Sequence, residues 1–330
     1  MGRNMRAMVV EQYGGPEAMA AAEWPEPEPA AGQIAIQVAY AGVNYADVLA
    51  RRDGYQAPTL PLVPGLEVSG TVRALGPGVG GYQVGQEVAA FIPSGGYAEV
   101  ALADLYNVYS LPDGSDLREA ATWLAVLPSA YALIHEVGRL ATDESVLVHS
   151  AAGGVGTAAV QLARAAGAAV VYGVVSSGEK VAYALEAGYD RVFVGEEYTA
   201  GIPEATAGRG VDLILDPVGG GTLRANLRLL ARFGRLVSYG NASAHEPWQI
   251  GPGDLYPRSQ GVFGFSLRTL ARDDPARLRR ITELALQLAA KAEVGLPITN
   301  EFPLLEAVEA HRLLESRSTT GKLVLRVTED

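Results

Sequence analysis

Residues 145–156 read Ser145-Val-Leu-Val-His149 and then Ser150-Ala-Ala-Gly-Gly-Val-Gly156, after which an Ala- and Leu-rich stretch continues to residue 166. The first five residues have the apolar composition of a buried strand, and the Ala- and Leu-rich stretch has that of a helix. Between them, Gly153 leaves room for a pyrophosphate to approach the backbone, and Gly156 lets the helix pack closely on the strand. This order of strand, glycine-rich turn and helix predicts a dinucleotide-binding site.

The expected contacts of this turn lie at the start of the helix. Its unpaired backbone N–H groups and the positive end of its dipole favour an anion there. Ala151 stands where the usual fingerprint has its first glycine, a change that a tight turn tolerates. The predicted phosphate-binding residues are Ala152, Gly153, Gly154, Val155 and Gly156.

The flanking sequence alternates short apolar runs with helical stretches. Strands are expected at residues 145–149, 169–175, 192–194, 213–215 and 236–239, and helices at 154–166, 179–187 and 222–231. Such alternation is typical of a parallel, doubly wound sheet with helices on both faces. We therefore predict an α/β fold with a Rossmann domain.

The first third of the chain has a different pattern. Ile34, Ile36, Val38 and Tyr40 alternate with smaller or polar residues, and further apolar runs at 68–75, 84–91 and 97–102 are separated by glycine-rich turns. Short strands with tight turns predict a compact, barrel-like domain. Helices are expected at 117–126 and 129–138, separated by Pro128, and again at 275–292 and 304–316, before a last strand at 322–327.

Composition excludes several classes of function. The 330 residues contain no cysteine, which rules out disulfides and thiolate metal sites, and the four histidines are not spaced as metal ligands. The formal charge of -11, with no basic cluster, argues against nucleic acid as a partner. The sequence contains no apolar signal core and no run of membrane-spanning length, so we expect a cytoplasmic protein that does not cross a membrane.

The end of the second expected strand selects the cofactor. Enzymes that use NAD place an acidic residue there to bind the ribose 2′-hydroxyl. This chain instead has Ser176 and Ser177, which would not repel a 2′-phosphate, and Lys180 is close enough in sequence to reach it. The nearest acid, Glu179, falls where the next helix begins. The pattern predicts NADPH.

Seven ordered landmarks resemble those of one known family. They are Gly42-Val-Asn-Tyr-Ala-Asp47, Arg52-Asp-Gly-Tyr55, Pro64-Gly-Leu-Glu-Val-Ser-Gly70, Leu147-Val-His-Ser-Ala-Ala-Gly-Gly-Val-Gly156, Asp216-Pro-Val-Gly-Gly220, Tyr239-Gly-Asn-Ala-Ser243 and Ser316-Arg-Ser-Thr-Thr-Gly-Lys322. From about Met5 onward, the chain resembles the zinc-free quinone oxidoreductase branch of the medium-chain dehydrogenase/reductase superfamily. Zinc-binding relatives carry Gly-His-Glu where this chain has Gly65-Leu66-Glu67, which together with the absence of cysteine predicts that no catalytic zinc is bound.

The resemblance implies a GroES-like catalytic domain formed by residues 1–125 and 266–330, an NADPH-binding Rossmann domain formed by residues 126–265, and an active site in the cleft between them. It also implies that Asn44 lies beside the nicotinamide and that Ser176 and Lys180 lie at the 2′-phosphate. The full set assigned to the cofactor is Asn44, Ser129, Ala152, Gly153, Gly154, Val155, Gly156, Ser176, Lys180, Tyr239, Gly240, Asn241, Ala242, Phe263, Phe265 and Lys322.

Several site residues have a structural alternative. Tyr55, which with Asn44 is assigned to catalysis, either protonates a substrate enolate or covers the mouth of the site by packing on the Pro58–Pro64 loop. Lys322 either neutralises the cofactor or lies on the terminal strand. For Glu67 a hydrogen bond within the domain, and for Asp47 a role in bracing a helix, are favoured over catalysis.

Three functions remain open at this point. The first is hydride transfer from NADPH to a quinone or an α,β-unsaturated carbonyl compound. The second is reduction of an enoyl thioester in a biosynthetic pathway, and the third is NADPH binding with little turnover. The resemblance further implies a homodimer, in which the apolar segment Gly261-Val-Phe-Gly-Phe-Ser266 of each subunit pairs across a two-fold axis.

Overall fold

The computed structural model describes residues 3–53, 55, 59–112, 114–243 and 249–328. The chain divides into two compact units. Unit 1 comprises Met1–Val126, Arg268–Arg280 and Leu296–Asp330, and unit 2 comprises Leu127–Leu267 and Ile281–Gly295. The predicted α/β fold, with a parallel sheet in unit 2 and a β-rich unit 1, is confirmed.

Unit 2 is built on a six-stranded parallel sheet with the order β10-β9-β8-β11-β12-β13. Successive strands are added on one side of β8 up to β10 and then on its other side from β11, so the chain order reverses between β8 and β11. This is the strand order of a dinucleotide-binding fold, in which ligands bind at the carboxyl ends of the strands near the reversal. The strands are β8 (Ser145–His149), β9 (Val170–Val175), β10 (Arg191–Val194), β11 (Val211–Asp216), β12 (Leu230–Ser238) and β13 (Gly261–Gly264).

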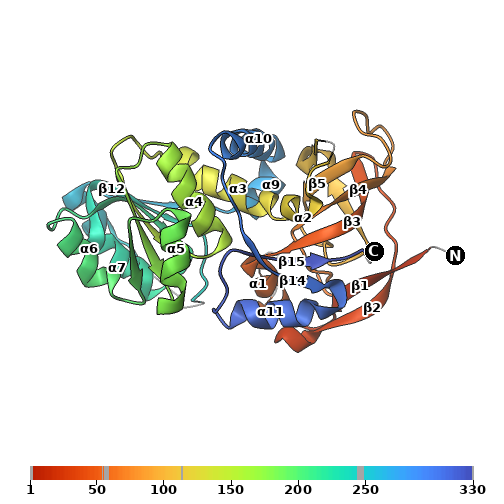
Figure 1. Ribbon diagram of the computed structural model, residues 1–330, viewed down its shortest axis with the longest axis horizontal. Coiled ribbons are helices and arrows are strands. Elements are labelled where there is room, and N and C mark those ends of the chain that lie inside the picture. The colour runs from red at the N-terminus through yellow and green to blue at the C-terminus, as the bar shows by residue number, and fades with distance from the viewer. Residues whose placement is uncertain (1–2, 54, 56–58, 113, 244–248, 329–330) are drawn as a thin grey trace. The chain divides into compact units, whose positions relative to one another are not determined.

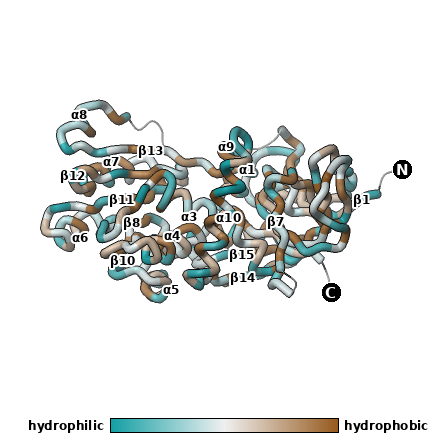
Figure 2. Tube along the Cα trace, turned by 90° about the horizontal axis from the view of Figure 1, so that it is seen from above, coloured by the Kyte–Doolittle hydropathy of each residue, from teal (hydrophilic) through white to brown (hydrophobic). Residues whose placement is uncertain are grey.

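Helices cover both faces of this sheet. Figure 1 shows α4 and α5 together on one side and α6 and α7 together on the other, and these are also the helix pairs that contact each other. The central strands β8 and β11 are largely buried, and their middle residues, 146–148 and 213–215, are apolar. Figure 2 shows brown, hydrophobic stretches of the trace in this unit. The helices of this unit include α4 (Gly154–Ala165), α5 (Val181–Ala187), α6 (Tyr198–Ala205), α7 (Gly221–Leu229) and α8 (Pro252–Leu255).

Unit 1 holds a two-stranded sheet and a seven-stranded sheet. In the larger sheet the order is β14-β15-β3-β4-β5-β7, with β6 also paired to β3. The terminal strand β15 therefore lies directly beside β3, with Leu323 opposite Val43. The strands are β1 (Asn4–Val10), β2 (Met19–Pro25), β3 (Gln33–Val43), β4 (Glu67–Leu75), β5 (Glu87–Phe91), β6 (Val100–Asp104), β7 (Val108–Ser110), β14 (Ile298–Pro303) and β15 (Lys322–Arg326).

Helices connect and cover these strands. They are α1 (Tyr45–Asp53), α2 (Leu117–Ala120), α9 (Leu267–Asp273) and α11 (Ala307–Glu315), while the division between the units falls within α3 (Trp123–Tyr131) and α10 (Pro275–Lys291). Among the described residues no helix is long and apolar enough to cross a membrane.

The structure differs from the sequence expectation at several points. Strand β12 begins at Leu230, six residues before the expected start at 236. Pro128 does not separate two helices but lies inside α3, which continues into a π-helical turn at Ala132–Glu136. Burial of residues such as Leu124 and Leu127 offsets the hydrogen bond that the proline cannot make. In addition, residues 281–295, expected in the catalytic domain, group with unit 2, where Gln161 and Gly295 exchange two hydrogen bonds of 2.9 Å.

Candidate functional site

The turn between β8 and α4 has the shape that a phosphate-binding loop requires. A Cβ atom at Gly156 would lie 2.5 Å from the carbonyl oxygen of Ser150, so only glycine fits there, whereas at Gly153 it would meet no atom closer than 3.4 Å. Gly153 is the N-cap of α4 and provides no side-chain cap, so the first amide groups of the helix are available to an anion. These residues fit a dinucleotide pyrophosphate. The left-handed residue of the turn is Ser150, with φ of 55°, a feature that the sequence did not reveal.

The end of β9 contains the residues expected to select the cofactor. Ser176 is exposed and Ser177 half-buried, and a short 3-10 turn at Gly178–Lys180 follows. Glu179 is exposed on that turn, while Lys180 is only 9% exposed. The strand end therefore presents hydroxyl groups, with a largely buried lysine next to them and an acid directed to solvent. This arrangement fits a 2′-phosphate better than a 2′-hydroxyl, which needs an acidic acceptor.

The turns that follow β11 and β12 are bound to each other. The N–H groups of Ala242 and Ser243 donate to the carbonyl oxygens of Pro217 and Val218, both at 3.0 Å. A Cβ atom at Gly240 would lie 2.7 Å from the carbonyl oxygen of Pro217, so glycine is required for this close approach. The predicted cofactor residues Tyr239, Gly240, Asn241 and Ala242 thus form one turn at the carboxyl end of the sheet.

A buried network beneath these turns contains His149. The Asn226 side chain donates to Asp216 Oδ2 at 3.1 Å, so its Oδ1 must accept from His149 Nε2, at 2.8 Å. Burial lowers the pKa of His149, in agreement with a neutral ring. Asp216 Oδ1 accepts from the N–H groups of Val218 and Gly219 at 2.7 and 3.0 Å. His149 therefore helps to hold the β11–α7 turn through Asn226 and Asp216.

The unit 1 part of the candidate site is a polar triad formed by Asn44, Glu67 and Lys322, in which Glu67 and Lys322 are buried and Asn44 is half-buried. Strands β15, β3 and β4 are neighbours in the sheet, which brings together three residues that are far apart in the sequence. Lys322 Nζ lies 2.8 Å from Glu67 Oε1 and 2.8 Å from Asn44 Oδ1, and Asn44 Nδ2 donates to Glu67 Oε1 at 3.0 Å. Glu67 Oε2 accepts from the N–H of Ala125 at 2.8 Å.

These contacts define the orientation of the Asn44 amide. Because an ammonium group only donates, the atom facing Lys322 must be the amide oxygen, and because a carboxylate accepts, the amide nitrogen must face Glu67. Lys322 Nζ has a third acceptor in the carbonyl oxygen of Val43, at 3.3 Å, so its three N–H groups are all engaged within unit 1. One N–H of Asn44 has no recorded acceptor among the described residues.

Other predicted site residues are placed as follows. Tyr55 is 39% exposed, and its backbone carbonyl oxygen accepts from Arg268 Nη1 at 3.4 Å; Pro58, part of the loop expected to pack on it, lies outside the described residues. Ser129 is buried on α3. Phe263, on the edge strand β13, is 44% exposed, and the N–H of Phe265 donates to the carbonyl oxygen of Ser238 at 2.9 Å.

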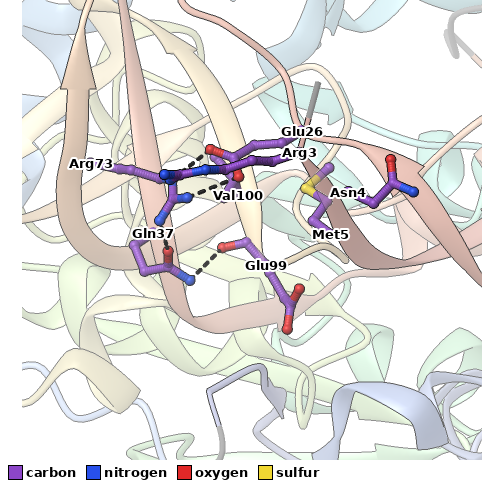
Figure 3. Close-up of a pocket in the computed structure, with 8 residues that line it drawn as sticks. All are labelled: Arg3, Asn4, Met5, Glu26, Gln37, Arg73, Glu99 and Val100. Atoms are coloured by element: carbon purple, nitrogen blue, oxygen red, sulfur yellow. Dashed lines mark hydrogen bonds and ion pairs between the residues drawn. The ribbon is translucent and has the colours of Figure 1, made fainter. Parts of the chain in front are cut away.

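Two cavities lie elsewhere in the described parts of the chain. In unit 1, a cavity of about 400 Å³ is lined by Arg73, Glu26, Gln37 and neighbouring residues. Figure 3 shows Arg73 bonded to both Glu26 and Gln37, so its polar groups are satisfied internally. In unit 2, a second cavity of about 590 Å³ lies beside α7 and α8. Neither is lined by a predicted site residue. Among the described residues, no group of three or more acidic or histidine side chains is arranged to hold a metal ion.

Comparison with known proteins gives matches over nearly the whole chain. A zinc-binding dehydrogenase model matches residues 154–286, and an alcohol dehydrogenase GroES-like domain model matches residues 30–113. A quinone oxidoreductase from Rattus norvegicus is 34% identical, with 97% of each chain covered. The phthioceranic/hydroxyphthioceranic acid synthase of Mycobacterium tuberculosis is 33% identical over 91% of this chain and 14% of the synthase. The crystal structure of an Escherichia coli quinone oxidoreductase complexed with NADPH has 29% identity and a TM-score of 0.88, with 98% of this chain and 99% of that chain covered.

Proposed function

Because the chain belongs to the medium-chain dehydrogenase/reductase superfamily, in its quinone oxidoreductase branch, we propose that it reduces a quinone or an α,β-unsaturated carbonyl compound with NADPH and without a catalytic metal. The main observation behind this proposal is the β8–α4 turn, where close packing requires glycine at position 156 and the first amides of α4 have no side-chain cap. Unit 2 is then the NADPH-binding unit, and unit 1 supplies Asn44 and Tyr55.

NADPH, when bound, supplies a hydride to the substrate. The protein's part is to hold the cofactor and to stabilise the charge that develops on the substrate. Residues 152–156 would hold the pyrophosphate on backbone amides, and Ser176 with Lys180 the 2′-phosphate. Asn44 keeps one N–H for a ligand, because Lys322 and Glu67 hold the rest of its amide in a single orientation.

Proton donation to the reduced substrate is assigned to Tyr55. Hydride addition to the β-carbon of an enone leaves an enolate, which must receive a proton at its α-carbon or oxygen. A phenol can donate that proton without first ionising. The partial exposure of Tyr55 agrees with a donor that exchanges its proton with water.

Metal independence is supported by the residues at the position where zinc-binding relatives carry their ligands. The chain has no cysteine, and Leu66 is buried, with 4% of its surface exposed. Its neighbour Glu67 is already engaged by Lys322, Asn44 and Ala125. A leucine side chain has no atom that could bind zinc.

The second candidate is reduction of an enoyl thioester. It is favoured by the similarity to a segment of the mycobacterial synthase, although this chain matches only 14% of that protein. Reduction of an enone and reduction of an enoyl thioester both add a hydride to the β-carbon of a conjugated carbonyl group. The two substrates therefore differ mainly in size.

A panel of quinones, alkenones and enoyl thioesters, assayed by the loss of NADPH absorbance, tests the assignment. We expect turnover with quinones or alkenones. Turnover with thioesters alone would replace the first proposal by the second. Tight NADPH binding with no turnover in the whole panel would instead establish the third function, binding without catalysis.

We also propose a cytoplasmic homodimer. The edge strand β13 presents backbone groups that pair with no further strand among the described residues, and Phe263 on it is partly exposed. Exposed apolar edge strands are commonly paired or covered.

A further inference from the structure

A second buried network lies beneath the Asn44 triad in unit 1, and it contains no residue of that triad. It is formed by Asp47 and Arg51 of α1, Tyr97 from the segment before β6, and His311 and Glu315 of α11. The helices α1 and α11 contact each other, as Figure 1 shows in unit 1. Asp47, Arg51, Tyr97 and His311 are each at most 1% exposed, so the network reaches solvent only at Glu315.

The direction of its hydrogen bonds is determined by Arg51. A guanidinium group only donates, so His311 Nδ1, which lies 3.2 Å from Arg51 Nε, must accept, and the ring proton must be on Nε2. His311 Nε2 then donates to the Tyr97 hydroxyl at 3.1 Å, and the hydroxyl donates to Asp47 Oδ2 at 3.3 Å. Burial lowers the pKa of His311 to about 3, with a smaller contribution from the Arg51 charge, so the ring is neutral.

Three groups of the described residues hydrogen-bond to the Asp47 carboxylate, and it accepts from each of them. Besides Tyr97, the N–H of Asn44 donates to Oδ2 at 2.9 Å and the N–H of Gly65 donates to Oδ1 at 3.2 Å. These two amides belong to the turn that carries Asn44 and to the segment that leads into Glu67. One carboxylate therefore fixes the backbone beneath two members of the triad.

We propose that Asp47 is a positioning residue for the reductase reaction: its ionised carboxylate, oriented by Tyr97, His311 and Arg51, holds the backbone that aligns Asn44 with Glu67. The inference rests on the proposed function, because it gives the triad its role. Protonation of Asp47 places a hydrogen on one of the two oxygens that accept from the amides of Asn44 and Gly65. Because a carboxylic acid accepts hydrogen bonds less strongly than a carboxylate does, protonation weakens the bonds that hold this backbone.

The surroundings of Asp47 place this change near neutral pH. Burial raises the pKa of Asp47 from 3.8 to about 7, against the lowering effects of the Asn44 amide and of the charges of Lys322 and Arg268. The groups facing it are Lys322 of β15, Arg268 of α9, Glu67 of β4 and Tyr97, with His311 of α11 and Arg51 of α1 behind Tyr97. We expect the catalytic rate to fall as the pH is lowered through about 7.

Unfolding does not account for such a fall. Folding raises the pKa of Asp47, so the stability that this group contributes is fully present below about pH 4 and is lost as the pH rises through about 7. Acidification from pH 8 to about pH 6 thus strengthens the contribution of Asp47 to folding while it removes the positioning carboxylate. Thermal melting measured beside activity separates the two effects.

The first test needs neither cofactor nor substrate. In NMR titrations of the cofactor-free protein, the amide protons of Asn44 and Gly65 and the carboxyl carbon of Asp47 should shift together, with a common midpoint near pH 7. An unchanged Asn44 amide between about pH 5.5 and 8.5 would overturn the proposal. If the amides titrate but the substrate panel gives no turnover, the reductase assignment fails while the link between Asp47 and Asn44 stands.

The second test uses matched variants in pH–rate profiles. Tyr97→Phe deletes one donor to the carboxylate and should move the acidic limb of kcat upward by about one pH unit. Tyr82→Phe, which deletes a hydroxyl bonded to the Val108 carbonyl oxygen in the same unit, should leave the limb in place. Equal profiles for the two variants would contradict the proposal.

Three further variants examine the His311 hydrogen bonds and the Asp47 carboxylate itself. His311→Gln retains one acceptor and one donor and should preserve the limb, whereas His311→Leu should shift it as Tyr97→Phe does. Asp47→Asn should reduce kcat about tenfold or more and give a profile without the acidic limb, since no carboxyl group remains to titrate. A limb that persists in a folded Asp47→Asn protein would assign it to another group.

Discussion

Replacing Lys322 by methionine should destabilise unit 1 more than any comparable change on the same strand. The Lys322 and Glu67 side chains are 4% and 1% exposed, and their charged atoms are 2.8 Å apart. Removing one partner of such a buried ion pair typically costs about 3–5 kcal/mol, because the other charge stays buried without compensation. Glu67 would keep the N–H groups of Asn44 and Ala125 as donors. We therefore expect a loss of about 3 kcal/mol, at the lower end of this range.

Strand β15 also provides the control. Arg326 pairs with Glu301 at 3.1 Å, but both side chains are about one-third exposed, at 36% and 30%. Exposed pairs contribute only about 0–1 kcal/mol. Arg326→Met should therefore cost less than about 1 kcal/mol, although it removes the same kind of contact from the same strand.

Urea unfolding followed by circular dichroism measures both free energies of unfolding. For a domain of this size, about 3 kcal/mol corresponds to a fall in Tm of roughly 6–12 °C. The double variant Glu67→Gln with Lys322→Met removes the unpaired charge and should recover part of the loss. Equal stabilities of Lys322→Met and Arg326→Met would refute the reasoning, since burial would then not distinguish the two pairs.

Four further predictions follow from the proposed function. Lys180→Ala should raise the KM for NADPH about tenfold or more and leave the KM for NADH nearly unchanged. The reason is that a charge-assisted hydrogen bond of about 1.5–3 kcal/mol is lost only for the cofactor that carries a 2′-phosphate. A native protein that prefers NADH would contradict this prediction. Tyr55→Phe should lower kcat with enones about 10²-fold and with quinones less, and an equal small effect on both would make Tyr55 a packing residue. Chelator treatment should leave turnover unchanged, whereas stoichiometric zinc lost together with activity would exclude the metal-free mechanism. Light scattering at low concentration should give a dimer mass, and a monomer would argue against pairing through Phe263 and its strand.

The nucleotide-binding unit could be predicted from the sequence because its signals are local. The strand, turn and helix of residues 145–165 follow one another directly, and each has its own composition. Periodicity likewise predicts β8, β9 and β11 to within two residues, whereas β12 begins at Leu230, six residues before its predicted start. The prediction for Pro128 is wrong for the converse reason. Its effect on the backbone is local, but the burial that keeps it inside α3 depends on tertiary packing.

The unit 1 network could not be derived in this way. Lys322 lies 255 residues from Glu67 and 278 from Asn44, and only the pairing of β15 with β3 brings them together. No periodicity or motif in one sequence reports which strands are neighbours. His311 and Tyr97 carried no signal at all, because a single buried histidine or tyrosine is most often a packing residue.

Two independent sets of contacts converge on Asn44, and they constrain different parts of it. Lys322 and Glu67 bind its side-chain amide, whereas Asp47 binds its backbone N–H. Loss of Lys322 should therefore free the amide to rotate while the turn stays in place, and loss of the Asp47 charge should displace the turn while the amide keeps its partners. A residue whose only role was packing would not need both its backbone and its amide to be fixed by buried charges, since each buried charge carries a desolvation cost. The double constraint is what we expect where one N–H must point at a reacting group, because it fixes both the position of the Asn44 turn and the direction of the Asn44 amide.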